Sequence, residues 1–377
     1  MEDSTTFLFP EVVAPNGRAF GWLRDPPDAR DRTFASELAQ RAPEESNRFF
    51  EERATTGKLR AGWIENAPGD PLPIYNQQRM GSCVANAVAA ALRHAWKQQP
   101  VIRQDREQKL REEKKYDPEF LFEKFDPSRL WIYYHGRTPE YSLTGQDLTP
   151  YDAGMNIRNA IKLVRKIGVC REEDWPYKDG QREAETKVIN GREVSVFPPG
   201  HAATIKPDAK AQQRATEFIT FPFEYFRIRA ITDDEVKVKP GLTAEQLGIL
   251  KRTEVEQMKA CIAEGYPVIY GFGIFENTPF GAETWTPEVD RFMEFPEKPG
   301  KRKNGHAVLA IGYNDDKKAF LCQNSWGPGW KKGPLEGKFW MPYSWFSTKR
   351  NDAHPAYDLW VIRPKNAPIT GFHPKQG

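Results

Sequence analysis

The chain has 377 residues, enough for one large domain or two smaller ones with a substantial buried core. It carries 55 Lys and Arg against 52 Asp and Glu, and the net charge of +3 indicates neither nucleic acid nor an anionic membrane surface as a partner. No stretch approaches the roughly 18 uninterrupted apolar residues of a membrane-spanning helix, and the N-terminal MEDSTTFLFPEVVAP lacks the pattern of a secretory signal.

The N-terminal region is predicted to be an extended arm. Residues 1–75 are rich in Pro, Gly and charged residues, and GWLRDPPDARDRTF is their most ordered-looking portion. One short helix is expected around Glu37–Gln40. We therefore divide the chain into an arm or wrapping segment at 1–60, a globular domain at 61–365 and a tail at 366–377.

A strongly helical segment begins after Ser82. In GSCVANAVAAALRHAW the apolar residues recur at helical spacing, Ser82 can serve as N-cap, and the many alanines predict a closely packed central helix. Cys83 falls in the first turn of this helix. The unpaired backbone N–H groups of a first turn favour negative charge, and therefore the thiolate that makes a cysteine nucleophilic.

The remaining cysteines have a plainer interpretation. The four cysteines are far apart and form no CxxC pair, so the sequence predicts neither a disulfide scaffold nor a metal site. We interpret three of them as small buried apolar residues, namely Cys170, Cys261 and Cys322.

Two further helical stretches are predicted in the middle of the chain. Asn156–Ile167 is amphipathic, and Gly168 is placed where a helix commonly stops. Helical character returns at Thr243 and ends at Gly265.

Irregular segments separate these helices. Asn190–Gly191 lies between two alternating runs and predicts a β-hairpin, whereas 197–214 contains prolines and is expected to be a loop. We expect insertions near 98–120 and 178–215 that shield an active site or recruit a partner.

The last third is rich in predicted strands: PVIYGFGIF, HAVLAIGY, AFLCQNSWG, GKFWMPYSWF and YDLWVIR. Helices that come early and strands that come late favour an α+β fold of two packed halves. The helical half spans about 76–180 and the β-rich half about 216–365, and the boundary between two such halves is a common place for an active site.

Gln77 is a candidate partner of Cys83. It lies on the loop that enters the helix, and its side-chain amide can turn back towards the helix start. With the backbone N–H of Cys83 it would form an oxyanion hole of two donors. The alternative is an ordinary loop glutamine.

Two blocks resemble the papain-like (C1) family of cysteine peptidases, in a divergent form typical of microbes. They are YNQQRMGSCVANA and NGHAVLAIGYNDDKKAFLCQNSWGPGW, within a resemblance that covers roughly residues 18–362. The resemblance implies a papain-like fold, with Cys83 as nucleophile and Gln77 as oxyanion donor. It also implies that His306 is the acid/base residue, that Asn324 orients it, and that Trp326 covers their hydrogen bond.

The resemblance implies substrate contacts as well. Gly154 matches the second glycine of a pair that hydrogen-bonds the peptide, and Ala153 replaces the first. Met155, Gly305 and Ala307 are expected to line the pocket for the substrate residue two positions before the scissile bond. The alternative is that this segment is a plain helix-entry turn.

Two departures from the family pattern bear on location. Met80 replaces the usual disulfide cysteine, and residues 1–75 contain no clear counterpart of the inhibitory pro-helix of secreted relatives. Both fit a non-secreted enzyme, or one that is controlled differently, and a cytoplasmic location is expected.

We therefore predict a cysteine endopeptidase that acts on a peptide or protein substrate as a monomer, without metal or cofactor. Cys83 would form a thioester that water hydrolyses, with His306 as acid and then as base. One alternative transfers the acyl group to an amine, as a transamidase or ligase does. The other is a binding or regulatory protein on a retired peptidase scaffold.

Overall fold

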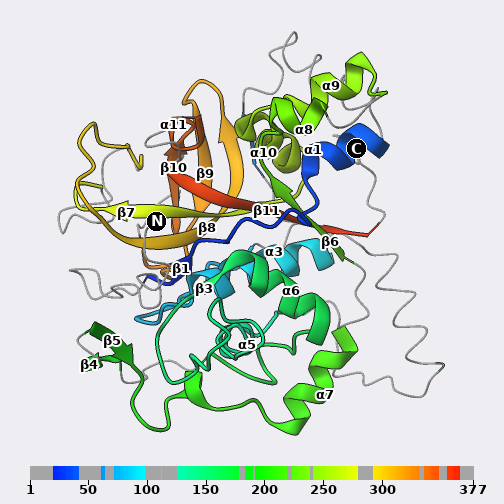
Figure 1. Cartoon of the computed structure of the whole chain (residues 1–377). Coiled ribbons are helices and arrows are strands. Elements are labelled where there is room, and N and C mark those ends of the chain that lie inside the picture. Colours follow the sequence, from blue (N-terminus) through cyan, green and yellow to red (C-terminus); the bar gives the residue numbers. More distant parts are fainter. Residues whose placement is uncertain are drawn as a thin grey trace.

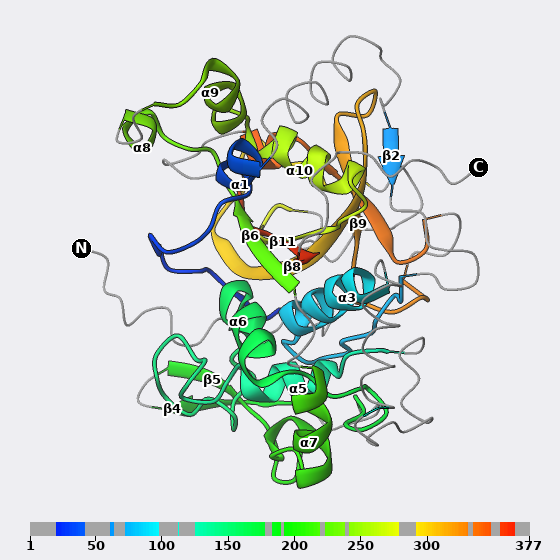
Figure 2. The same cartoon turned by 90° about the vertical axis from the view of Figure 1, so that its right-hand side faces the viewer.

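A computed structural model describes the chain at residues 20–41, 61–63, 72–97, 112, 125–177, 183–189, 192–218, 223–237, 241–278, 292–330, 335–347 and 355–365. These residues form a helical half and a β-rich half, and one long helix, α3 (Cys83–Lys97), lies between them (Figures 1 and 2). Most of the expected arm, the charged insertion near 98–120 apart from residue 112, and the expected tail lie outside the described residues.

The β-rich half is built on one seven-stranded sheet in the order β10-β9-β8-β7-β11-β6, with β2 pairing with β8. Its strands are β2 (Ala61–Trp63), β6 (Phe223–Ile228), β7 (Val268–Phe275), β8 (Arg302–Asn314), β9 (Ala319–Gln323), β10 (Lys338–Pro342) and β11 (Ala356–Pro364). The five strand-like segments expected in the last third of the chain all contribute to this sheet. The last part of GKFWMPYSWF instead forms a short helix, α11 (Ser344–Ser347).

The helical half surrounds the other side of α3. It contains α5 (Arg129–His135), α6 (Ile157–Ile167), the short η3 (Ala202–Thr204) and α7 (Ala209–Phe218). The helix expected at Asn156–Ile167 is confirmed as α6, and it ends at Gly168, whose φ of 76° suits glycine. The expected loop at 197–214 is wrong in its second part, because α7 begins at Ala209, after the last proline, where alanines and other good helix formers follow.

Short helices lie beside the sheet in the β-rich half: α1 (Phe34–Arg41), α8 (Asp233–Lys237), α9 (Ala244–Leu250) and α10 (Glu254–Ala263). The helical stretch expected between Thr243 and Gly265 is two helices, and each starts with a capping box. The short helix expected around Glu37–Gln40 is confirmed as α1. Among the described helices, none is long and apolar enough to span a bilayer.

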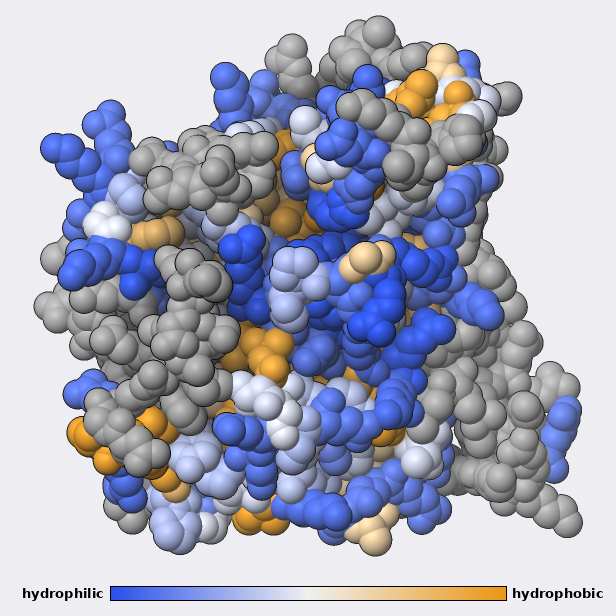
Figure 3. Space-filling view, viewed as in Figure 1, coloured by the Kyte–Doolittle hydropathy of each residue, from blue (hydrophilic) through white to orange (hydrophobic). Residues whose placement is uncertain are grey.

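The predicted hairpin is also present. Strands β4 (Glu185–Ile189) and β5 (Arg192–Val196) pair in antiparallel register, although their connecting turn lies outside the described residues. Val188 is 70% exposed, and apolar side chains gather over this hairpin on an otherwise largely hydrophilic face (Figure 3).

Residues 20–33, which we call the strap, cross from one half to the other. Within the strap, β1 (Trp22–Leu23) pairs in parallel with β3 (Met155–Asn156), just before α6. At its far end Thr33 forms a bridge with Arg227 of β6. The strap therefore joins the two halves directly above the start of α3 (Figure 1).

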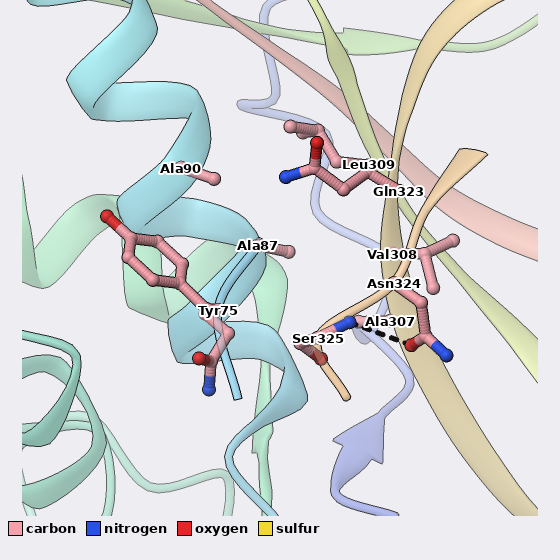
Figure 4. A pocket seen from close by; sticks show the side chains of 10 residues that line it. Tyr75, Ala87, Ala90, Ala307, Val308, Leu309, Gln323, Asn324 and Ser325 are labelled. Atoms are coloured by element: carbon pink, nitrogen blue, oxygen red, sulfur yellow. Dashed lines mark hydrogen bonds between the residues drawn. The ribbon is translucent and has the colours of Figure 1, made fainter. Parts of the chain in front are cut away.

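The alanines of α3 allow the two halves to approach closely. Ala87 and Ala90 face Val308 and Leu309 of β8 across a cavity of about 10 Å³, room for a single water molecule (Figure 4). A larger residue on this face would have no space, so the small side chains of α3 fix the distance between helix and sheet.

Ala90→Leu is expected to lower the free energy of unfolding by about 1–3 kcal/mol, because it overfills this contact. The matched control is Ala209→Leu, the same change at an exposed position on α7, which should alter stability by less than about 0.5 kcal/mol. Urea unfolding followed by circular dichroism measures both. Equal effects would show that the contact between α3 and β8 is not tight.

Candidate active site

The first turn of α3 holds Cys83 with its side chain fully buried. The helix starts here because the Ser82 carbonyl accepts the first helical hydrogen bond, from Asn86 N at 3.0 Å. The Ser82 hydroxyl lies 2.7 Å from the Tyr177 hydroxyl, which ties the helix start to the helical half. Cys83 is therefore fixed at the positive end of a long helix.

His306 comes from the opposite side, on β8. It is fully buried and pairs in the sheet with Phe272 of β7. The hairpin of β8 and β9 then returns the chain so that Asn324, directly after β9, lies beside it. His306 Nε2 is 2.8 Å from Asn324 Oδ1.

The direction of that hydrogen bond follows from a second contact. Asn324 Oδ1 also accepts from the backbone N–H of Ser325 at 2.8 Å, so the atom facing the imidazole is the oxygen (Figure 4). His306 Nε2 must therefore carry the proton and donate it. This leaves Nδ1 as the ring nitrogen that can exchange a proton with other groups.

Aromatic rings enclose the His306–Asn324 pair. The Trp326 ring lies 5.3 Å from the His306 ring, and Phe272 and Phe20 pack edge-on against the imidazole at 5.8 and 5.5 Å. These apolar rings keep water from the hydrogen bond, as the sequence resemblance implied for Trp326.

Cys83 and the His306 segment meet at the backbone. Burial raises the pKa of the Cys83 thiol to about 11, and the N–H groups of Ala307, Gly21 and Val84 oppose this rise because they favour the thiolate. Ala307 directly follows His306, so the sulfur lies beside the residues that carry the imidazole. Two segments more than two hundred residues apart in sequence are thereby brought together.

Gln77 lies on the loop before α3 and is fully buried. Its Nε2 donates to Met80 O at 2.9 Å, and its Oε1 accepts from the Ser325 hydroxyl at 2.6 Å. The second contact orients the amide, so that the nitrogen and not the oxygen is turned towards the start of α3. Gln77 is thus linked to the Asn324–Ser325 segment as well as to the Cys83 loop.

Asp152 supports the loop before Cys83, although no sequence pattern singled it out. Its buried carboxylate accepts from the backbone N–H of Gly81 at 2.9 and 3.0 Å and also receives the Tyr133 hydroxyl. Burial raises the pKa of Asp152, while these hydrogen bonds oppose the rise. The carboxylate holds the loop that leads into Cys83 against the helical half. No pattern distinguishes such a buried acid from the exposed ones in the chain.

The strap covers this site. Phe20 packs on both His306 and Trp326, and the Gly21 N–H faces the Cys83 sulfur. A side chain at Gly21 would overlap the Gly81 carbonyl oxygen, so only glycine permits this approach. Phe20 and Gly21 therefore cover Cys83 and His306, and both of these residues are fully buried.

The expected substrate residues contact the strap. Met155 N donates to Gly21 O at 2.8 Å, and Gly154, with φ of +68°, comes so close that a side chain would overlap the same oxygen. Gly305 lies under Trp22. The end of the Met155 side chain lies against Gly136 in the helical half.

Gly271 of β7 is a neighbour of the site that sequence reasoning did not single out. Together with Gly305 it makes room for the Trp22 indole, because a side chain on either glycine would overlap that ring, and Tyr357 stacks on it at 6.2 Å. The available signal was the pair of glycines, Gly271 and Gly273, inside the predicted strand PVIYGFGIF, since such glycines often mark close approach of another group.

The other cysteines have no place in this site. Cys170, Cys261 and Cys322 are buried free thiols, as predicted. Among the residues that the structure describes, no group of three or more His, Cys, Asp or Glu could hold a metal ion.

Comparison with known proteins gives a consistent picture. Residues 237–350, which include His306 and Asn324 but not Cys83, match the Peptidase_C39 like family. The chain is 28% identical over 354 residues to an uncharacterized peptidase C1-like protein, L477, of Acanthamoeba polyphaga mimivirus, which covers 93% of this chain and 89% of that protein.

One solved structure supports a specific comparison. The crystal structure of xylellain, a cysteine protease from Xylella fastidiosa, superimposes with a TM-score of 0.58 at 27% identity. The similarity covers 94% of this chain and 97% of xylellain, so both halves and the region between them are shared.

Gly21→Ala is expected to displace the strap and so to speed alkylation of Cys83 by iodoacetamide at least tenfold. The matched control is Gly329→Ala, because a side chain at Gly329 meets nothing within 4 Å. Mass spectrometry of the labelled peptides separates Cys83 from the three other thiols. Equal labelling rates in Gly21→Ala and Gly329→Ala would contradict the covering role of the strap.

The same displacement should lower the pKa of Cys83 from about 11. Exposure to water removes the burial that favours the neutral thiol, and this outweighs the loss of the Gly21 N–H because burial is the largest contribution to the raised pKa. The helix N-terminus then favours the thiolate. The thiolate ultraviolet absorbance, taken as the difference between each chain and its Cys83→Ala counterpart, should rise at lower pH in Gly21→Ala than in wild type. An unchanged or higher midpoint would contradict burial as the cause.

Proposed function

The chain is a papain-like cysteine peptidase, and we propose that it hydrolyses peptide bonds through a thioester on Cys83. The observation that supports this assignment of roles is the meeting of the first turn of α3 with the segment that carries His306, where the Ala307 N–H faces the Cys83 sulfur. A thiol at a helix start beside a histidine oriented by a third group is a nucleophile with its base.

In the first half of the reaction, the Cys83 thiolate attacks the carbonyl carbon of the scissile bond. The Cys83 N–H and Gln77 Nε2 donate to the oxyanion that forms. His306 Nδ1 then gives its proton to the departing amine as the carbon–nitrogen bond breaks, which leaves a thioester on Cys83.

In the second half, His306 Nδ1 removes a proton from water, and the resulting hydroxide attacks the thioester carbonyl. Cys83 leaves as thiolate, and His306 retains the proton, so the starting pair is restored. Asn324 keeps Nε2 protonated through its 2.8 Å hydrogen bond and so directs Nδ1 to the chemistry in both halves.

A peptide substrate must take the place of Phe20–Trp22. We propose that a substrate strand hydrogen-bonds to the Met155 N–H, which Gly21 O now occupies, and that Gly305 and Ala307 flank it from β8.

The alternatives are not favoured. Gln77, Cys83, His306 and Asn324 are all present with the contacts described above, whereas a retired scaffold commonly loses one member. Acyl transfer to an amine would use the same thioester, and product analysis with an added amine separates it from hydrolysis.

Substitution of the proposed groups in the Gly21→Ala chain tests the mechanism on a fluorogenic peptide. Cys83→Ala and His306→Ala should abolish turnover, and Gln77→Ala should lower kcat by about 10²–10³, the usual cost of one oxyanion donor. Cys170→Ala is the control for loss of a buried thiol and should retain activity. Turnover within a few-fold of the parent in a folded Cys83→Ala or His306→Ala chain would refute the roles proposed.

A further inference from the structure

We propose that Asp25 of the strap is a positioning residue for the segment that binds substrate, so that the strap stays anchored in the active enzyme while only its Phe20–Leu23 part moves aside. This inference rests on the proposed function. It assigns two separate tasks to one short segment, obstruction of the site by Phe20–Leu23 and support of the site by Asp25.

Asp25 binds the start of α6. Its side chain is buried, and its Oδ1 accepts from Arg158 N at 3.1 Å and from Asn156 Nδ2 at 2.8 Å. Asn156 is the N-cap residue of α6 but makes no capping hydrogen bond with its own side chain. The strap thus supplies the cap that α6 lacks, and a carboxylate is well suited to the positive end of a helix.

This cap lies next to the Met155 N–H. α6 begins at Ile157, with only its N-cap Asn156 between it and Met155, whose N–H is the group proposed to bind the substrate backbone. Met155 has little freedom of its own, because it lies between Gly154, with φ of +68°, and the first turn of α6. Fixing Asn156 and Arg158 therefore fixes the direction of the Met155 N–H.

Asp25 also binds the β-rich half. Asp25 Oδ2 accepts from Trp360 Nε1 of β11 at 2.7 Å, and the Asp25 N–H donates to Asp358 Oδ2, also at 2.7 Å. Asp358 in turn accepts from Arg227 at 3.1 Å. Asp25 thereby joins the start of α6 to the sheet that carries His306, and it holds the two sides of the site in register.

Arg158 completes the anchor. Its Nη1 donates to Pro26 O at 2.6 Å, and its Nη2 pairs with Asp31, further along the strap. The strap from Asp25 to Asp31 is consequently bound to α6 by buried charged groups, whereas Phe20–Leu23 is held by ring packing and strand pairing. Displacement of the first part does not require release of the second.

The two possible roles of Asp25 predict opposite results. If Asp25 only holds an inhibitory segment in place, its loss frees the site and raises turnover. If Asp25 positions the segment that binds substrate, its loss impairs peptide binding even when the site has already been opened.

The test uses full-length chains that carry Gly21→Ala, with and without Asp25→Ala. We expect Asp25→Ala to raise KM for a fluorogenic peptide about tenfold or more, since misplaced binding groups weaken substrate alignment. kcat and the rate of Cys83 alkylation should remain within about threefold, because Asp25 touches neither the sulfur nor the imidazole. Asp28→Ala is the matched control on the same strap, as the Asp28 carboxylate contacts Arg30 and Lys162, and it should leave KM unchanged.

Conservative variants keep the test decisive if Asp25→Ala does not fold. Asp25→Asn keeps an oxygen for the Arg158 and Asn156 donors but turns an NH2 group towards Trp360 Nε1, so it should raise KM less than Asp25→Ala does. Asn156→Ala removes one of the donors to Asp25 and should raise KM with kcat preserved. An unchanged KM in every folded variant of Asp25 and Asn156 would overturn the inference. So would Asp25→Ala alone raising turnover in the wild-type chain to the Gly21→Ala level.

Failure of the proposed function gives a different pattern. A Gly21→Ala chain whose Cys83 is readily alkylated but which cleaves no peptide contradicts the proposed function. A Gly21→Ala chain that cleaves peptide, with KM insensitive to Asp25, contradicts only the positioning role.

Discussion

The structure depends on a thiol that is enclosed between backbone N–H groups from three separate segments. The helix α3 contributes Val84, the sheet contributes Ala307 and the strap contributes Gly21. All three N–H groups favour the thiolate, and the first two place the sulfur at a helix N-terminus and beside Ala307, the residue that follows His306. The third excludes water from the same sulfur, and the resulting burial raises the pKa of the thiol.

Close approach explains the residue types around this sulfur. Gly21, Gly154 and Gly305 each lie where a side chain would overlap a neighbouring group, and the alanines of α3 bring the helix against β8. Polar side chains then fix directions within this dense packing. Asn324 sets which nitrogen of His306 carries the proton, and Ser325 orients the Gln77 amide.

The sequence was sufficient for the elements that carry the chemistry. The helix after Ser82 and the strands that carry His306 and lead to Asn324 follow from periodicity and capping, which are local properties. The predicted α+β, papain-like fold is confirmed by the similarity to xylellain. The helix α7 was missed because prolines before it suggested a loop, although alanines within it favoured a helix.

The strap and its anchors could not be predicted in the same way. Asp25, Asp152 and Trp22 owe their roles to partners far away in the sequence, and nothing in their immediate neighbours indicates burial. The segment GWLRDPPDARDRTF taken by itself predicts an extended conformation, which is correct, but it does not indicate what the segment covers. Only the glycines inside the strand β7 indicated that another group approaches there.

Direct observation of the thioester tests the central claim most sharply. The opened Gly21→Ala chain is mixed with an activated peptide ester, quenched in acid and analysed by mass spectrometry of its digestion fragments. The account predicts an acyl group on the fragment that contains Cys83, formed and lost at rates that match turnover. Turnover without any acylated fragment, or with the acyl group on a different residue, would contradict it.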